Sequence, residues 1–339
     1  ERTLQVLDAA VLVISGADGV QGHVETLWKL LKYYRIPVFL FVNKMDQEGT
    51  DRETLLSELK KRLDGNCVDF NQEETDYAAF AEEAAMSEES LLEEYLESGR
   101  LDRETLKKAI AGRKLFPCFF GSALKIQGVE ELLKGLERYA SSAVCREAFS
   151  ARVYKISRDE AGSRLTHLKV TGGVLRVKMP LTNRREGMEE GEIWEEKADQ
   201  IRLYSGSSYQ TVNEAGPGSI CAVTGLSRTF AGEGLGEEAE GSLPILEPVL
   251  TYRIELPEGT NVHETFLKLL KLEEEIPELH IVWNERLSEI HAQVMGEVQI
   301  EILKSLIRDR FQLDVEFGDG NIVYKETILE PVEGVGHFE

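Results

Sequence analysis

The sequence predicts a multidomain protein, with an α/β unit at residues 1–145, a small β-barrel at 147–246 and an α+β, ferredoxin-like unit at 249–325. Three observations predict this order. Apolar runs alternate with amphipathic stretches in the first part, short strands with glycine turns fill the middle, and a β-α-β-β-α-β pattern follows. At 339 residues the chain exceeds what one core comfortably holds, so several domains are expected.

The first unit contains runs that are apolar at every position, such as residues 37–42. A run of this kind is typical of a strand in a parallel sheet that is covered on both faces. In the stretch after residue 24, apolar residues recur at spacings of three and four, which places Trp28 in the core. The sequence predicts strands at 9–15, 38–42 and 117–120, and helices at 24–34, 53–63 and 129–139.

An acidic, helix-rich insertion occupies residues 71–112, between the second and third predicted strands. Its glutamates are interleaved with alanine, leucine and tyrosine at helical spacing. We expect a solvated pair of helices on the rim of the unit, with a partner-binding surface as the alternative.

The tetrapeptide Asn43-Lys44-Met45-Asp46 follows directly on a buried-type strand, where ligands bind in folds of this kind. An aspartate can accept two hydrogen bonds from guanine N1–H and N2–H, and adenine would leave that carboxylate unpaired. The mismatch costs roughly 2–5 kcal/mol, which is enough to select one purine. The Lys44 stem can lie along the base, and the Asn43 amide can connect the loops around it.

A second loop, Gly121-Ser122-Ala123-Leu124, follows another apolar strand and precedes a predicted helix. A small residue at 123 would let a backbone N–H approach guanine O6, and Ala123 is the expected donor. Either loop alone is weak, but two such loops in this order indicate a guanine site. The candidate guanine-binding residues are Asn43, Lys44, Asp46, Ser122, Ala123 and Leu124.

On these residues the chain resembles the translational GTPases of the elongation factor G type, and most of all the ribosomal-protection tetracycline-resistance proteins. The start of the chain and the turn Asp18-Gly19-Val20-Gln21 resemble the segment after the family's switch II. Residues 164–175 resemble its barrel domain, and Met295-Gly296-Glu297 resembles the start of a later helix. The resemblance implies a partial P-loop-type G domain, a translation-factor barrel, a ferredoxin-like domain, and a further domain beginning at 326–339.

No Gly-x4-Gly-Lys-Ser/Thr phosphate loop occurs in the sequence, and the chain starts on Glu1. We therefore expect a fragment whose parent hydrolyses GTP with Mg2+, while the fragment itself is inactive and holds no bound cofactor. No catalytic residue is assigned here. His23 follows the Asp18-Gly19-Val20-Gln21 turn instead of the family's catalytic motif, so it is read as an ordinary residue near a helix start.

The formal charge of −22 is unusual for a protein that meets RNA, but the charge is unevenly distributed. The stretch from Arg146 to Arg185 is locally basic, and its cations either cover an ordinary barrel surface or face RNA. The candidates to face RNA are Arg152, Lys155, Arg158, Arg164, Lys169, Arg176 and Lys178.

The third unit is expected to contain strands at 249–256, 279–283, 287–293 and 313–317, with helices at 262–275 and 297–311. In the second helix, two sets of apolar residues form one broad face that core packing would explain: Val298, Ile302 and Leu306, and Ile300, Leu303 and Ile307. A linker is expected near Leu246-Glu247-Pro248.

The four cysteines, Cys67, Cys118, Cys145 and Cys221, are far apart and fit a reducing compartment and a packing role. No metal-ligand spacing and no membrane span are evident, so a cytoplasmic location without membrane or DNA partners is expected.

The resemblance leaves three functions open. The first is ribosome protection against tetracycline, favoured because residues 91–101 and the acidic insertion look more like that branch. The second is a translocating elongation factor. The third is a ribosome-binding scaffold that kept the base loops without hydrolysing GTP, which a phosphate loop encoded upstream would exclude. The expected partners are ribosomal RNA, ribosomal proteins, GTP and GDP.

Overall fold

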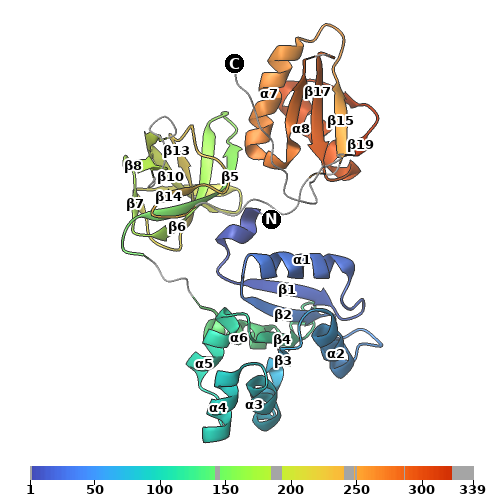
Figure 1. The fold of residues 1–339 in the computed structure, drawn as a ribbon, viewed down its shortest axis with the longest axis vertical. Helices are drawn as coiled ribbons and strands as arrows, with labels where there is room; N and C mark the ends of the chain where they lie inside the picture. The colour runs from blue at the N-terminus through green and yellow to red at the C-terminus, as the bar shows by residue number, and fades with distance from the viewer. Residues whose placement is uncertain are drawn as a thin grey trace, which may run out of the picture.

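The computed structural model of the chain describes residues 2–141, 146–184, 193–239, 248, 250–285 and 287–322. Figure 1 shows three lobes in chain order, with the N-terminal 3-10 helix η1 (Arg2–Val6) lying where they approach one another. Four expectations fall outside the described residues: the role of Cys145, the charge at Arg185, the linker at 246–247, and a further domain at 326–339.

The α/β unit is built on a parallel sheet with the strand order β1-β2-β4-β3. Its strands are β1 (Ala10–Ser15), β2 (Val38–Asn43), β3 (Cys67–Asp69) and β4 (Phe116–Phe120). The predicted strands at 9–15, 38–42 and 117–120 are therefore confirmed within one residue at each end. Strand β3 was missed because three residues are too few for a periodic pattern.

Helices cover both faces of this sheet. They are α1 (Gly22–Tyr33), α2 (Arg52–Arg62) and α6 (Val129–Tyr139). The acidic insertion adds η2 (Phe70–Gln72) and three helices, α3 (Tyr77–Ala85), α4 (Glu89–Ser98) and α5 (Arg103–Ala111). The expectation of a solvated pair was wrong. Phe80, Leu91 and Ile110 are almost fully buried against the sheet, because the apolar side of the insertion is needed to cover that face.

The apolar residues of strand β2 are buried on both faces of the sheet, as their sequence pattern predicted. Leu40 and Val42 belong to the core beneath α1 and α2, which also contains Trp28. Phe39 and Phe41 belong to the opposite core with Phe80. Successive side chains of a strand point to opposite faces, so both sets are buried only when helices lie on both sides.

The middle unit, residues 146–239, wraps antiparallel strands around a single core that includes Leu168, Val170 and Trp194. The main sheet has the order β11-β10-β13-β6-β5-β14, and β7 with β12 and β8 with β9 form two short ribbons. The strands are β5 (Ser150–Arg158), β6 (Arg164–Gly172), β7 (Leu175–Arg176), β8 (Pro180–Thr182), β9 (Glu195–Lys197), β10 (Gln200–Ser205), β11 (Ser208–Val212), β12 (Glu214–Ala215), β13 (Ile220–Thr224) and β14 (Gly234–Gly236).

The third unit is a β-α-β-β-α-β arrangement with the sheet order β16-β17-β15-β18, in which β19 also pairs with β15. Its elements are β15 (Leu250–Glu255), α7 (Val262–Glu275), η3 (Pro277–Leu279), β16 (Ile281–Asn284), β17 (Glu289–Val294), α8 (Glu297–Phe311), β18 (Glu316–Phe317) and β19 (Asn321–Ile322). Residues of α7 and α8 share one core with the sheet, so the two helices cover the same face.

One expectation for α8 was wrong. Ile300, Leu303 and Ile307 are buried, but Val298 is 77% and Ile302 55% exposed. The apolar stripe is wider than the part of the helix that lies against the sheet.

A buried lysine joins the barrel unit to the N-terminal segment. The Lys169 Nζ on β6 donates to the Val6 carbonyl at 2.9 Å and to Asp8 Oδ1 at 2.6 Å. Lys169 itself is only 6% exposed. An ammonium this well buried is stable because both partners accept from it.

Replacing Lys169 by methionine keeps the length of the side chain and removes these donors. We expect the free energy of unfolding to fall by about 1–3 kcal/mol, because the Val6 carbonyl loses its partner in a buried setting. Lys178→Met is the matched control, since Lys178 also pairs at 2.6 Å, with Asp199, but is 67% exposed. Its effect should stay within about 0.5 kcal/mol. Equal losses in urea unfolding for the two variants would contradict the role of burial.

Candidate functional site

The candidate site lies at the carboxyl edge of the parallel sheet. Strands β2 and β4 are neighbours with Val42 opposite Phe120, so the loops that follow them leave the sheet side by side. Two backbone hydrogen bonds connect the loop bases, from Gly121 N to Val42 O and from Met45 N to Gly121 O, both at 3.0 Å. The structure therefore brings together the two segments that are far apart in the sequence.

Asn43 is the residue that connects the two loops. Its Oδ1 accepts from the Lys44 N–H and from the Ala123 N–H, each at 2.8 Å. The first bond supports Lys44 in the left-handed region, at φ +65°, which a non-glycine residue adopts only with local support. This is the loop-connecting role predicted for the Asn43 amide.

The Ala123 N–H is the predicted donor to guanine O6, and that role stays a prediction. The N–H is already paired with Asn43 Oδ1. The reason is geometric, since the side chain that connects the loops needs a donor on the second loop. Guanine O6 can use this N–H only by sharing it with, or taking it from, Asn43.

Asp46 keeps 18% of its side-chain surface exposed and lies within 3.4 Å of the Lys125 Nζ. The Ser122 hydroxyl, which donates to the carboxylate, and the nearby Lys125 lower the pKa of Asp46 below its usual value, against the opposing effect of desolvation. At neutral pH the group is therefore an acceptor only, as recognition of guanine N1–H and N2–H requires.

The second loop is closed on itself by a reciprocal pair of hydrogen bonds, Ser122 N to Gln127 O at 2.9 Å and Gln127 N to Ser122 O at 3.0 Å. Ser122 is 1% exposed, whereas Leu124 at the tip is 89% exposed. Gly128 follows at φ +73°, and a Cβ there would meet Phe120 O at 2.3 Å. The shape of the loop thus depends on this glycine.

Sequence reasoning missed the residues that support the first loop. Thr50 Oγ1 donates to Met45 O at 3.0 Å and to Gln47 O at 2.8 Å. Gly16, at the end of β1, donates its N–H to Asn43 O at 2.7 Å, and a Cβ there would lie 3.1 Å from that oxygen. A glycine placed one residue after a strand is a signal that could have been used, whereas Lys125 and Thr50 carry none.

Most of the cations proposed to face RNA form ion pairs with other residues of the chain. Arg152, Arg164 and Lys169 have side chains only 14%, 13% and 7% exposed, and each is ion-paired. Their partners are Glu238, Glu274 and Asp8. In this arrangement the three side chains are engaged within the chain, which disfavours contact with a phosphate, and their role in facing RNA stays a prediction.

The other four candidates differ in their surroundings. Arg158 is 25% exposed and contacts Glu274, whereas Lys155 is exposed. Arg176 and Lys178 are exposed and pair with Glu214 and Asp199. Lys155, Arg176 and Lys178 remain candidates to face RNA.

Cys67, Cys118 and Cys221 are free and buried, as expected for a packing role. Within the described residues, no group of His, Cys, Asp and Glu is arranged to hold a metal ion. In that same part of the chain, no helix is long and apolar enough to cross a membrane.

Comparison with known families defines the class of protein. Residues 1–142 match the family described as the elongation factor Tu GTP binding domain. Residues 148–238 match elongation factor G domain 2. The α/β unit is thus a GTP-binding domain and the middle unit a translation-factor barrel.

Across both matched segments the chain is similar to translational GTPases of the elongation factor G type. It is 26% identical to elongation factor G 2 of Syntrophus aciditrophicus (strain SB), over all of this chain and 60% of that protein. It is 30% identical to the tetracycline resistance protein TetP of Clostridium perfringens, over 96% of this chain and 53% of that protein. The chain therefore spans between half and two thirds of the length of these relatives.

A crystal structure of a Thermus thermophilus protein has the same fold, with a TM-score of 0.76. The superposition covers 94% of this chain and 54% of the other, at 21% sequence identity.

Proposed function

We propose that this chain supplies guanine recognition in a ribosome-associated GTPase that protects ribosomes from tetracycline. The observation that carries the proposal is the joining of the two loops by Asn43, which leaves Asp46 ionised beside them. The full activity, with GTP and Mg2+, belongs to the complete protein. The expected partners are ribosomal RNA and ribosomal proteins, and the expected location is the cytoplasm.

In this proposal Asp46 accepts from guanine N1–H and N2–H. The Lys44 stem lies along one face of the base, and Leu124 at the loop tip shields another part of it. O6 shares the Ala123 N–H with Asn43 Oδ1, so the contact between the loops is kept. Guanine thus inserts between two loops that are already held together, which keeps the ordering cost of binding low.

Selectivity for the base is distinct from affinity for the nucleotide. The sequence contains no phosphate loop, so nothing supplies the backbone cradle, the lysine and the magnesium-binding hydroxyl that hold a triphosphate. We propose that catalysis and most of the affinity come from residues outside this sequence.

The 339-residue chain alone is accordingly expected to bind GTP weakly, with a dissociation constant above about 100 µM, because only base contacts contribute. Isothermal titration with GTP and GDP measures this directly. A sub-micromolar dissociation constant for either nucleotide would contradict the proposed division of labour between base and phosphate contacts.

The choice of ribosome protection is supported by the relation to TetP at 30% identity over nearly the whole chain. An elongation factor G-like translocase is the second candidate, supported by the match of residues 148–238 to elongation factor G domain 2 and by the relation to elongation factor G 2.

The protein encoded by the complete gene distinguishes the two functions. Purified ribosomes translating with tetracycline should regain synthesis when it is added with GTP. Ribosomes depleted of elongation factor G should not advance messenger RNA with it. The reverse pair of results would favour translocation. No effect in either assay, together with normal GTP binding, would contradict both functions.

A further inference from the structure

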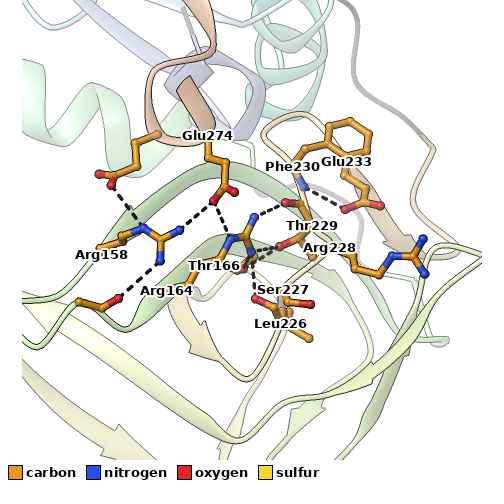
Figure 2. Close-up of polar contacts among 12 residues, drawn as sticks. Arg158, Arg164, Thr166, Leu226, Ser227, Arg228, Thr229, Phe230, Glu233 and Glu274 are labelled. Carbon is orange, nitrogen blue, oxygen red and sulfur yellow. Dashed lines mark hydrogen bonds and ion pairs between the residues drawn. The ribbon is translucent and has the colours of Figure 1, made fainter. Parts of the chain in front are cut away.

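Two arginines of the β5–β6 hairpin converge on one carboxylate of the third unit, as Figure 2 shows. The Glu274 Oε2 lies 3.1 Å from the Arg158 Nη2 and 3.3 Å from the Arg164 Nε. Arg158 and Arg164 are directly opposite each other in the strand register. Two cations in that position repel each other, so an anion between them is favourable.

Arg164 is held in place by the barrel, independently of Glu274. Its Nη1 donates to Leu226 O at 2.9 Å and to Thr229 Oγ1 at 2.8 Å, and its Nη2 donates to Thr229 O. The Thr166 and Thr229 hydroxyls are also joined, at 2.8 Å. Figure 2 shows the guanidinium enclosed by these partners, with Nε directed toward Glu274. The barrel thus presents a pre-oriented donor to the third unit.

Helix α7 ends in a run of acids, Glu273-Glu274-Glu275, at its last three residues. Negative charge at a helix C-terminus is unfavourable, because the unpaired carbonyls there already carry partial negative charge. Glu275 is 8% exposed and pairs with Arg310 of α8 within the third unit, while its Oε1 also lies 3.9 Å from the Arg158 Nε. Glu274 points out of the unit instead, and its compensating charge comes from the barrel.

The Glu274 side chain is 44% exposed, whereas that of Arg164 is 13% exposed. Water therefore reaches the acidic partner but hardly reaches the basic one. Pairs exposed on one side are weak and are screened by salt. This contact can hold two units in one arrangement and still release.

We propose that Glu274, with Arg158 and Arg164, forms an electrostatic latch that fixes the third unit on the barrel and opens to let that unit reorient. The latch is made of residues that neither base loop contains. It does not depend on the proposed function and would operate whichever activity the complete protein has.

The distance between the two units tests the latch. Two spin labels on the 339-residue chain report this distance. They are attached to cysteines introduced at exposed positions, by Ser205→Cys at the end of β10 and by Ser305→Cys on α8. Cys145→Ser limits labelling elsewhere. Pulsed electron spin resonance should give one narrow distance distribution. Glu274→Arg should broaden it and add a second distance, because three cations then repel. Arg158→Gln should give a smaller broadening, and about 0.5 M salt should broaden the unsubstituted chain.

Glu264→Arg is the matched control, since Glu264 lies on the same helix but pairs with Lys268 of that helix. It should leave the distribution unchanged. Far-ultraviolet circular dichroism confirms that each variant is folded, and Arg164 is left intact because it also shapes the barrel loop. An unchanged distribution for both Glu274→Arg and Arg158→Gln would overturn the proposal. Equal broadening by Glu264→Arg would also overturn it.

Discussion

Replacing Asp46 by asparagine in the complete protein is expected to exchange its preference for guanine for a preference for xanthine. Asparagine can accept from N1–H through Oδ1 and donate from Nδ2 to the O2 of xanthine. Against guanine, the Nδ2 faces the N2 amino group, and two donors meet. The affinity for GDP should fall by about 2–5 kcal/mol, roughly 30- to 4,000-fold, while the affinity for XDP rises.

Competition binding with GDP and XDP measures both changes. Asp51→Asn is the matched control, because Asp51 lies in the same loop region but caps α2, where its side chain accepts from the Thr54 N–H. Asparagine caps helices about as well as aspartate, so Asp51→Asn should change neither affinity. Unchanged selectivity in Asp46→Asn would show that another group reads the base.

The second large effect is expected from Gly128→Ala. The added Cβ would meet Phe120 O at 2.3 Å and the Gly121 Cα at 2.9 Å, at a φ of +73° that alanine disfavours. Backbone atoms cannot move aside as a flexible side chain can. We expect the free energy of unfolding to fall by about 2–4 kcal/mol and the Ser122–Gln127 loop to lose its shape. In the complete protein, guanine affinity should fall with it.

Gly99→Ala is the matched control, because it separates the effect of the steric clash on stability from the effect of backbone strain. Gly99 ends α4 at φ +69°, but nothing lies within 4 Å of a Cβ there. Gly99→Ala should lower the free energy of unfolding only by what the left-handed conformation costs an alanine, about 1–2 kcal/mol. Urea unfolding of both variants of the 339-residue chain gives the difference. If Gly128→Ala were no more destabilising than Gly99→Ala, the loop would not depend on this close approach.

The sequence predicted the elements that have strong patterns. The helices at 129–139, 262–275 and 297–311 were predicted at the residues where α6, α7 and α8 occur. The fully apolar strand at β2 was predicted because both of its faces are covered. Strand β1 has the same kind of sequence, but Val11 is 40% and Val13 56% exposed. Composition alone does not say which strand of a sheet lies at its edge.

The two base loops were also predictable, because parallel strands bring their carboxyl ends to one edge. The Asn43–Ala123 contact spans 80 positions in the sequence and follows from that rule. The hydrogen bonds and ion pairs within these loops could not be predicted from the sequence. The pairing of Lys125 with Asp46 and the occupation of the Ala123 N–H depend on loop geometry that no local pattern encodes.

The basic stretch shows the limit of reading charge along a chain. Arg152, Arg164 and Lys169 look like one positive surface in the sequence. Their partners Glu238, Glu274 and Asp8 lie 86, 110 and 161 positions away, two of them in other units. Long-range ion pairs cancel charges that a sequence window counts as free.

The crystal structure of the complete protein with GDP tests the central claim most directly. We expect guanine N1 and N2 within about 3.2 Å of the Asp46 carboxylate oxygens, and O6 within the same distance of the Ala123 nitrogen. The Asn43 Oδ1 should share the N–H of that nitrogen with O6. A base bound elsewhere, or an Asp46 carboxylate that does not contact it, would contradict the account.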